Sequence, residues 1–227
     1  MSNTAKAPEK KYKLAIFDFD GTIADTIDCS VESFQQMLEH YDLDRMSVKT
    51  VKKHFNSDPQ QMIQELMYDP TYPPDFYERA AFRFYSLYST LMVDYTKLFR
   101  GFKKVFKTFE DAGIQLAVAS NQVYELTSEN LHILEVGDYF DFVIASDQVE
   151  NPKPHPDMAE QLMLATGIDP AQILIIGDEP RDILMGKSIG AVTVGVTWGY
   201  GSEEELAEVK PDYLFSKVTD LEDLINS

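Results

Sequence analysis

The segment that decides the fold is residues 14–22, which read LAIFDFDGT. Its first four residues form a short, continuous apolar run, and this pattern predicts a buried strand. Asp18 and Asp20 follow at once, and the alternation of an extended backbone places both carboxylates on one side, where they can face one ligand. Aspartate is disfavoured in strands and like charges held close are costly, so the pair indicates a functional site. Gly21 permits a sharp turn, and Thr22 supplies a hydroxyl.

Beyond residue 99 the chain alternates between strand and helix patterns. Apolar runs predict strands at 115–119, 142–145, 173–176, 192–196 and 213–215, each separated from the next by a stretch with helical spacing. Strands that are separated by helices indicate a parallel sheet covered by helices on both faces. The predicted fold class is therefore α/β.

Residues 25–98 show a different pattern, with no second strong strand. Phe34 and Leu38 lie at helical spacing, as do Phe82, Tyr85 and Tyr88. This region is therefore predicted to be an inserted helical module of about seventy residues. We interpret its many aromatic side chains between residues 68 and 99 as packing between helices, with an aromatic substrate pocket as the alternative.

Composition limits the partners of the chain. The formal net charge of −18 disfavours nucleic acid and anionic membranes, because both attract basic proteins. Cys29 is the only cysteine, which excludes an intramolecular disulfide and a cysteine-built zinc site. Residues 1–12 are predicted to be a disordered tail without a secretory signal, and no apolar stretch approaches the roughly 20 residues of a membrane helix. We therefore expect a cytoplasmic protein, a monomer or a homodimer, that acts on a small molecule.

Polar side chains follow three of the predicted strands, and a lysine lies in the loop after a fourth. These residues are Asp18 and Asp20, Ser120 and Asn121, Asp178, and Lys153. Ligands of open parallel sheets bind beyond the carboxyl ends of the strands, so one shared site is expected there. Carboxylates without nearby histidine or cysteine suit a hard cation such as Mg²⁺. A lysine and a serine hydroxyl suit the oxygens of a phosphoryl group, and a carboxylate can attack phosphorus.

The stretch DFDGTIADT at residues 18–26 resembles the first motif of the haloacid dehalogenase-like (HAD) hydrolase superfamily in its phosphatase form. The resemblance covers about residues 13 to 224, including the position of the insert. It implies a Rossmann-like parallel sheet covered by helices, with an inserted all-helical cap domain. The implied boundaries are a tail at 1–12, a core at 13–24 and 99–227, and a cap at 25–98.

The resemblance also implies roles for the residues at the strand ends. Asp18 is the expected nucleophile and Asp20 the expected general acid and base. The expected Mg²⁺ ligands are Asp18, Asp178 and the backbone carbonyl of Asp20, with Glu179 and Asp182 in support. The expected phosphate-binding residues are Thr22, Ser120, Asn121 and Lys153. Glu179 stands where many relatives carry serine or threonine, so it is either a further metal ligand or a charge that weakens phosphate binding.

The insert resembles the helical cap of the phosphoglycolate phosphatase and phosphomutase branch, in which a loop of the cap reaches the site. The corresponding residues here are Lys52, Lys53, His54 and Asn56. A basic pair there suits a second anionic group on the substrate, and the alternative is a solvated helix face. The loop lacks the glycine often found in relatives, which puts phosphoglycolate itself in doubt. Residues 198–202, WGYGS, resemble a loop common in this branch.

The leading hypothesis is a Mg²⁺-dependent phosphatase that acts on a small phosphorylated metabolite. Alternatives of the same fold are a phosphosugar mutase and a pyrophosphatase. Thr22 weakly favours a hydrolase, since mutase relatives often carry valine there, and the presence of Asp20 disfavours a dehalogenase. From another class, the chain could be a non-catalytic protein that binds a phosphorylated ligand. Such a binder would not need both the nucleophile and the acid.

Overall fold

The computed structural model describes residues 11–54 and 59–226. Its main sheet has six parallel strands in the order β5-β4-β1-β6-β7-β8. In chain order these strands are β1 (Leu14–Phe17), β4 (Gln115–Ser120), β5 (Phe142–Ala145), β6 (Ile173–Gly177), β7 (Val192–Val196) and β8 (Tyr213–Phe215). All six predicted strands are confirmed, with β4 and β6 each one residue longer than expected.

The first strand lies at the centre of the sheet, between β4 and β6. Leu14 is paired in register with Gln115 on one side and with Ile173 on the other. All four residues of β1 are fully buried, because helices cover both faces of a parallel sheet. The continuous apolar run before Asp18 is therefore a consequence of this central position.

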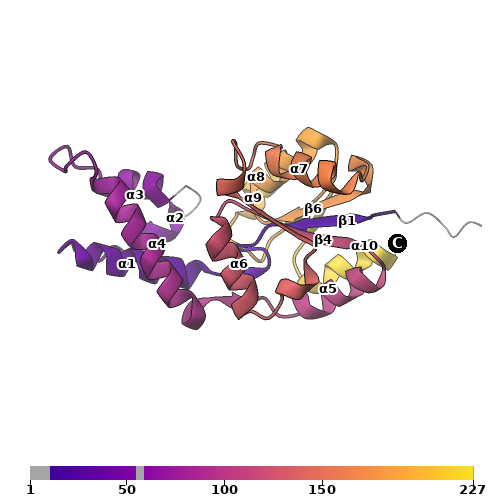
Figure 1. Ribbon diagram of the computed structural model, residues 1–227, viewed down its shortest axis with the longest axis horizontal. Helices are drawn as coiled ribbons and strands as arrows, with labels where there is room; N and C mark the ends of the chain where they lie inside the picture. Colours follow the sequence, from indigo (N-terminus) through magenta and orange to yellow (C-terminus); the bar gives the residue numbers. More distant parts are fainter. Residues whose placement is uncertain (1–10, 55–58, 227) are drawn as a thin grey trace, which may run out of the picture.

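Helices cover the two faces of the sheet (Figure 1). The α-helices of this part of the chain are α5 (Phe102–Asp111), α6 (Tyr124–Ile133), α7 (Asp157–Thr166), α8 (Pro180–Ile189), α9 (Glu203–Val209) and α10 (Asp223–Asn226). Short 3₁₀ turns are η1 (Gly137–Tyr139), η2 (Ser146–Gln148), η3 (Pro170–Gln172) and η4 (Val218–Glu222). On one face Phe17 packs edge-on against Phe106 of α5, with ring centroids 5.7 Å apart. On the other face Met158 of α7 and Met185 of α8 pack against Ile16 and Ile175. The α/β fold is confirmed.

The insert consists of helices in the described residues, as predicted. They are α1 (Ile27–His40), α2 (Val48–Lys53), α3 (Pro59–Met67) and α4 (Phe76–Tyr95). Figure 1 shows them as a separate group beside the sheet, with α6 next to α4. Their buried apolar side chains form a cluster of their own, which Leu126 of α6 joins from the core. No helix among the described residues is long and apolar enough to cross a membrane.

Two details of the insert differ from the prediction. Phe82 was assigned to the apolar face of its helix, but its side chain is 77% exposed. The buried face of α4 instead carries Phe84, Leu87 and Tyr88, because packing against α1 and α3 selects the face. The second difference is a two-stranded antiparallel ribbon of β2 (Ala24–Asp25) and β3 (Lys97–Leu98), which joins the insert to the core. Strands of two residues are too short to give a periodic signal.

Candidate active site

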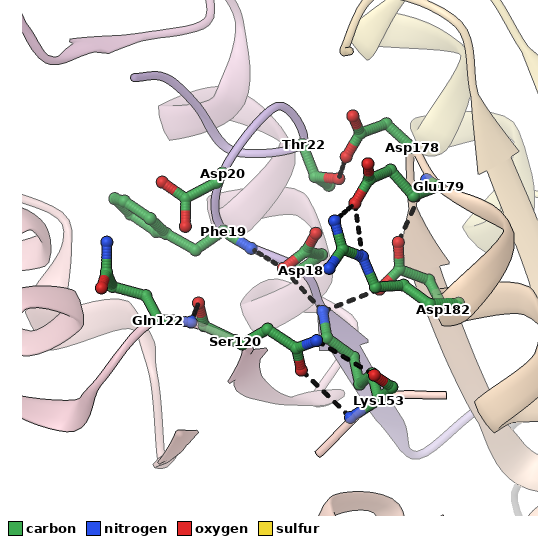
Figure 2. Close-up of polar contacts among 12 residues, drawn as sticks. Asp18, Phe19, Asp20, Thr22, Ser120, Gln122, Lys153, Asp178, Glu179 and Asp182 are labelled. Atoms are coloured by element: carbon green, nitrogen blue, oxygen red, sulfur yellow. Dashed lines mark hydrogen bonds and ion pairs between the residues drawn. The ribbon is translucent and has the colours of Figure 1, made fainter. Parts of the chain in front are cut away.

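The carboxyl ends of β1, β4 and β6 and the loop after β5 bring the predicted residues together (Figure 2). Asp18, Ser120 and Asp178 follow or end these strands, as expected, and Asp182 lies in the first turn of α8. All four side chains are buried. Buried polar groups need partners, so the contacts within this group define what the site can do.

Lys153 is the centre of the charge arrangement. Its Nζ lies 2.7 Å from Oδ1 of Asp18 and 2.7 Å from Oδ1 of Asp182, and its side chain is 1% exposed. Burial alone lowers the pKa of a lysine, but the two carboxylates hold the pKa of Lys153 above its ordinary value. The side chain is therefore a fixed positive charge beside Asp18.

Asn121 positions this lysine through its backbone. Its Nδ2 donates to the carbonyl oxygen of Lys153 at 3.0 Å, and its Oδ1 accepts from the backbone N–H of Lys153 at 3.0 Å. Both polar groups of the amide are thus used, whereas the sequence placed the Asn121 side chain on the phosphate. The structure points to a supporting contact, because an amide engaged in two hydrogen bonds has little capacity left for a ligand.

Asp18 is held by one oxygen only. Its Oδ1 accepts hydrogen bonds from the backbone N–H of Phe19 at 2.7 Å and from Lys153, which leaves Oδ2 outside the hydrogen bonds among the described residues. Burial, followed by the charge of Asp182, raises the pKa of Asp18 well above its ordinary value against the opposing effect of Lys153. One oxygen is therefore oriented while the other is available to a reacting group.

Asp178 directly follows β6 and is tightly enclosed. Its Oδ1 accepts from the Thr22 hydroxyl at 2.7 Å, and its Oδ2 accepts from the backbone N–H of Tyr200 at 2.7 Å. A Cβ atom at Gly21 would lie 2.4 Å from Oδ2, and one at Gly199 would lie 2.3 Å away, so both positions require glycine. Burial, with the charge of Asp182, raises the pKa of Asp178 to about 6.

The contact with Asp178 changes the interpretation of Thr22, which the sequence placed on the phosphate. A hydroxyl has one proton, and that of Thr22 is donated to Asp178. Ser120 differs: its Oγ accepts from the backbone N–H of Gln122 at 3.0 Å, and its hydroxyl faces Asp20, whose pKa it helps to lower, so its proton can go to Asp20 or to a ligand.

A candidate metal site is formed by Asp18, Asp178 and Asp182. Each offers one carboxylate oxygen, and these three oxygens all lie within 4.8 Å of one another. The sequence placed Asp182 only in support and expected Asp20 in the set through its carbonyl. Among the described residues it is the Asp182 carboxylate that completes the group. Three buried carboxylates against one lysine leave an excess of negative charge, which suits a hard cation.

Asp20 lies at the edge of this group and is half-buried. Its Oδ1 accepts a hydrogen bond from the Thr26 hydroxyl at 2.6 Å. Burial raises the pKa of Asp20 above its ordinary value, in spite of that hydrogen bond and the positive charges of Lys153 and Arg181. A carboxyl group with a raised pKa is suited to giving up and taking back a proton.

Glu179 forms an ion pair with Arg181 and is not part of the carboxylate group. Nε of Arg181 lies 2.5 Å from Oε2 of Glu179, and Nη2 contacts the same oxygen. Burial raises the pKa of Glu179 to about 7, although Arg181 opposes this shift. A surface hollow beside the pair is lined by Lys153, Pro154, Glu179, Pro180, Arg181 and Glu205.

The cap residues that the sequence singled out make local contacts. Nζ of Lys52 lies 3.8 Å from Oδ1 of Asp28 on α1, and both side chains are exposed. Nδ1 of His54 lies 2.8 Å from the carbonyl oxygen of Thr50. Lys53 is the last residue of α2, and Asn56 lies outside the described residues. Substrate contact by this loop stays a prediction.

Three residues near the site were not predicted: Thr26, Arg181 and Tyr200. The hydroxyl of Thr26 reaches Asp20, Arg181 pairs with Glu179, and Tyr200 contacts both Asp178 and Thr26. Thr26 ends the quoted first motif and Tyr200 stands in the WGYGS loop, so both lay within segments already singled out. Their partners lie far away in the chain, and the motifs do not name those partners.

Comparison with known proteins is consistent with this geometry. A family model described as haloacid dehalogenase-like hydrolase matches residues 15–196. The chain belongs to this family. Among its curated relatives, pyrophosphatase PpaX of Bacillus pumilus is 27% identical over 213 residues, which cover 94% of this chain and 96% of the relative. Pyrophosphatase PpaX of Listeria monocytogenes is 27% identical over 214 residues, covering 93% and 95%.

Solved structures of HAD-like proteins share the fold. A predicted phosphoglycolate phosphatase from Haemophilus somnus has a TM-score of 0.85 at 23% identity, covering 96% of this chain and 98% of that one. A haloacid dehalogenase-like hydrolase from Bacteroides fragilis has a TM-score of 0.84 at 23% identity, covering 93% and 100%. At this identity the likeness supports the fold alone, and it confirms the expected Rossmann-like architecture. The family and its phosphatase-named relatives identify the chain as an enzyme of the HAD phosphatase type.

Proposed function

We propose that this HAD-like enzyme is a Mg²⁺-dependent phosphatase that hydrolyses a small phosphorylated metabolite through an aspartyl phosphate on Asp18. The observation that carries the proposal is the state of Asp18. Its Oδ1 is fixed by Lys153 at 2.7 Å and by the backbone of Phe19, while Oδ2 is left for the reaction. A nucleophile that is oriented through one oxygen and open at the other is what an in-line attack requires.

The reaction then divides between two carboxyl groups. Oδ2 of Asp18 forms a bond to phosphorus as the bond to the leaving oxygen breaks, and the Asp20 carboxyl gives its proton to that oxygen. In the second step the Asp20 carboxylate takes a proton from a water molecule that attacks phosphorus. The bond from phosphorus to Asp18 breaks and inorganic phosphate is released. The raised pKa of Asp20 supports this double role, since it keeps the protonated form accessible.

Positive charge for the phosphoryl oxygens comes from the chain itself. Lys153 is a buried ammonium group beside Asp18, and Ser120 has a proton to donate. Preorganised donors of this kind stabilise the charge that spreads over a transferring phosphoryl group. Asn121 holds the backbone of Lys153, so it supports phosphate binding without the contact that the sequence suggested.

The residues present fit a divalent cation. Asp18 and Asp178 would hold Mg²⁺, with the carbonyl of Asp20 as a further ligand and Asp182 beside it, since three carboxylate oxygens of the group lie within 4.8 Å. When bound, the ion supplies positive charge to the phosphoryl oxygens. Glu179 is engaged with Arg181, and this pairing favours a role outside the ligand set.

Pyrophosphate hydrolysis is the second candidate. Two relatives at 27% identity, each covered over more than nine-tenths of its length, are named pyrophosphatase. The same two steps apply, with phosphate as the leaving group in place of an alcohol. A non-catalytic binder is less well supported, because it would not need both the nucleophile and the acid, and Thr22 weakly favours a hydrolase over a mutase.

Phosphate release from a panel of substrates tests the proposal. The panel contains phosphoglycolate, sugar phosphates, nucleoside monophosphates and pyrophosphate, each assayed with Mg²⁺ and with EDTA, and Asp18→Asn is the blank. Release that needs the metal and vanishes in the blank is the expected result, and the best substrate separates the two candidates. Release that persists in Asp18→Asn would overturn the role of that residue, and no release with Mg²⁺ bound would favour a mutase or a binder.

The cap prediction has its own test on the same panel. We expect Lys53→Ala to raise KM for substrates with a second anionic group more than for singly charged ones, because a basic group near the leaving group would contact the extra charge. Lys49→Ala on the same helix is the matched control. Equal effects of Lys53→Ala on both substrate types would assign this loop to the scaffold.

A further inference from the structure

Tyr200 connects the two functional halves of the site. Its backbone N–H donates to Oδ2 of Asp178 at 2.7 Å. Its hydroxyl accepts from the backbone N–H of Thr26 at 2.5 Å, and it lies 3.1 Å from the Thr26 hydroxyl and 3.3 Å from Oδ1 of Asp25. Tyr200 therefore contacts the candidate metal ligand Asp178 through its backbone. Through its side chain it contacts Asp25 and Thr26.

The direction of these hydrogen bonds follows from the number of protons. The Thr26 hydroxyl has one proton, and it is donated to Oδ1 of Asp20 at 2.6 Å. In the contact between the two hydroxyls Thr26 is therefore the acceptor, and the single proton of Tyr200 is shared between Thr26 at 3.1 Å and Oδ1 of Asp25 at 3.3 Å. Along the branch through Thr26 the bonds run in one direction, from Tyr200 to Thr26 to Asp20. Hydrogen bonds in such a chain polarise and strengthen one another.

The position of Thr26 is a second, independent observation. Thr26 is the N-cap residue of α1, where a threonine side chain ordinarily accepts a hydrogen bond from the first turn of its helix. This one makes no side-chain cap bond. Its hydroxyl serves Asp20 instead, although Thr26 is buried and its helix begins the cap. Departures from local preference of this kind occur at functional sites.

We propose that Tyr200 is a positioning residue for the general acid and base: its hydroxyl fixes Thr26 as a donor to Oδ1 of Asp20. The inference rests on the proposed function in assigning Asp20 its role. With Oδ1 occupied, the proton that Asp20 gives to the leaving oxygen is carried on Oδ2. Tyr200 does not touch the reacting atoms, and its effect on the reaction passes through Thr26.

Substrates with different leaving groups distinguish a positioning role of Tyr200 from a general loss of structure. An alkoxide needs a proton as it departs, whereas 4-nitrophenolate is stable without one, so misplaced acid catalysis affects alkyl phosphates most. We expect Tyr200→Phe, which keeps the ring and the backbone N–H, to lower kcat for the best alkyl phosphate of the panel about 5- to 20-fold. The kcat for 4-nitrophenyl phosphate should change less than about twofold, since its acid requirement is small.

Matched variants sharpen the experiment. Tyr68→Phe removes a hydroxyl from an exposed tyrosine and should match the wild type on both esters. Thr26→Val should reproduce Tyr200→Phe, whereas Thr26→Ser, which keeps the hydroxyl, should restore the alkyl phosphate. In an Asp20→Asn background, Tyr200→Phe should have no further effect on the alkyl phosphate, because two residues that act through one group are not additive.

Two results would overturn the proposal. One is an equal loss on both esters, and the other is an undiminished effect of Tyr200→Phe in the Asp20→Asn background. Crystal structures of wild type and Tyr200→Phe give a readout that does not depend on activity, and we expect the contact between Thr26 and Asp20 to be lost in the variant. An unchanged Asp20 would refute the positioning role. A wild type that is silent on both esters would count against the proposed function, while the crystallographic comparison still decides the role of Tyr200.

Discussion

Lysine–carboxylate contacts occur both in the core and in the cap, and they differ in distance and in exposure to solvent. In the core, Lys153 lies 2.7 Å from two carboxylates with 1% of its side chain exposed. In the cap, Lys52 lies 3.8 Å from Asp28 with 43% of its side chain exposed. Water screens the second pair, so it constrains little, whereas the first cannot lose a partner without leaving a buried charge. Burial therefore fixes the positions of the charged side chains in the core site, whereas the charged side chains of the cap pair remain in solvent.

The largest expected effect is on activity, in the core. Asp18→Asn should lower turnover by more than about a thousandfold, because a neutral amide cannot attack phosphorus. The fold should persist, since Lys153 keeps Asp182 as a partner. Phosphate release measures the first effect and thermal melting the second. The cap variant Asp28→Asn, which alters the partner of Lys52, is the control and should retain activity.

The next effect compares the two lysines by the same substitution. Lys153→Met leaves the buried carboxylates of Asp18 and Asp182 without their cation, and it should lower the free energy of unfolding by about 3–5 kcal/mol. Lys52→Met should change it by less than about 0.5 kcal/mol, because that pair is exposed. Urea unfolding monitored by circular dichroism measures both. Similar losses in the two variants would break the distinction between core and cap.

The burial of carboxyl groups in the core should also determine how the free energy of unfolding depends on pH. In the folded protein the pKa of Asp178 is raised from 3.8 to about 6. Between these values the folded state retains a proton that the unfolded state has released, so stability falls as pH rises from about 4 to 6. For the metal-free protein in EDTA, Asp178→Asn should remove about 3 kcal/mol of this fall.

A control from the cap completes this measurement. Asp44 is exposed there, and Asp44→Asn should leave the slope of the wild type unchanged. Urea midpoints in EDTA at pH 4, 5 and 6 provide the comparison. The raised pKa values of Asp18, Asp20 and Glu179 leave part of the slope in both proteins. A slope in Asp178→Asn as steep as that of the wild type would show that the charge of Asp178 is already compensated in the folded protein.

The smallest expected effect lies where the cap meets the core. Tyr88 of α4 is buried, and within the described chain its hydroxyl and Oδ1 of Asn130 on α6 make no hydrogen bond of ordinary geometry, although the Asn130 side chain lies close enough to the hydroxyl to lower its pKa. Removing an unsatisfied hydroxyl should be neutral or should stabilise by up to about 1 kcal/mol. Thermal melting of Tyr88→Phe measures this, with Tyr68→Phe as an exposed control. A clear loss of stability would mean that the hydroxyl has a partner after all.

The architecture could be predicted from the sequence because burial in a parallel sheet requires a local pattern of apolar residues. A strand covered on both faces must be apolar throughout, as residues 14–17 are, and the polar residues that end such strands mark the site. Asp18, Ser120, Lys153 and Asp178 were placed from this pattern and from the family motifs, and the structure brings them together. The face of α4 was harder to predict, since Phe82 has the right spacing and yet is exposed.

The motifs by themselves determined which residues gather at the strand ends and which chemical types they offer. Only the tertiary structure decided which partner each side chain takes. It directed Thr22 to Asp178 and Asn121 to the backbone of Lys153, and it joined Asp182 to the carboxylate group. The physical reason is separation along the chain. Thr26 and Tyr200 are 174 positions apart, and a hydrogen bond between them depends on the packing of the whole sheet, which no local pattern encodes.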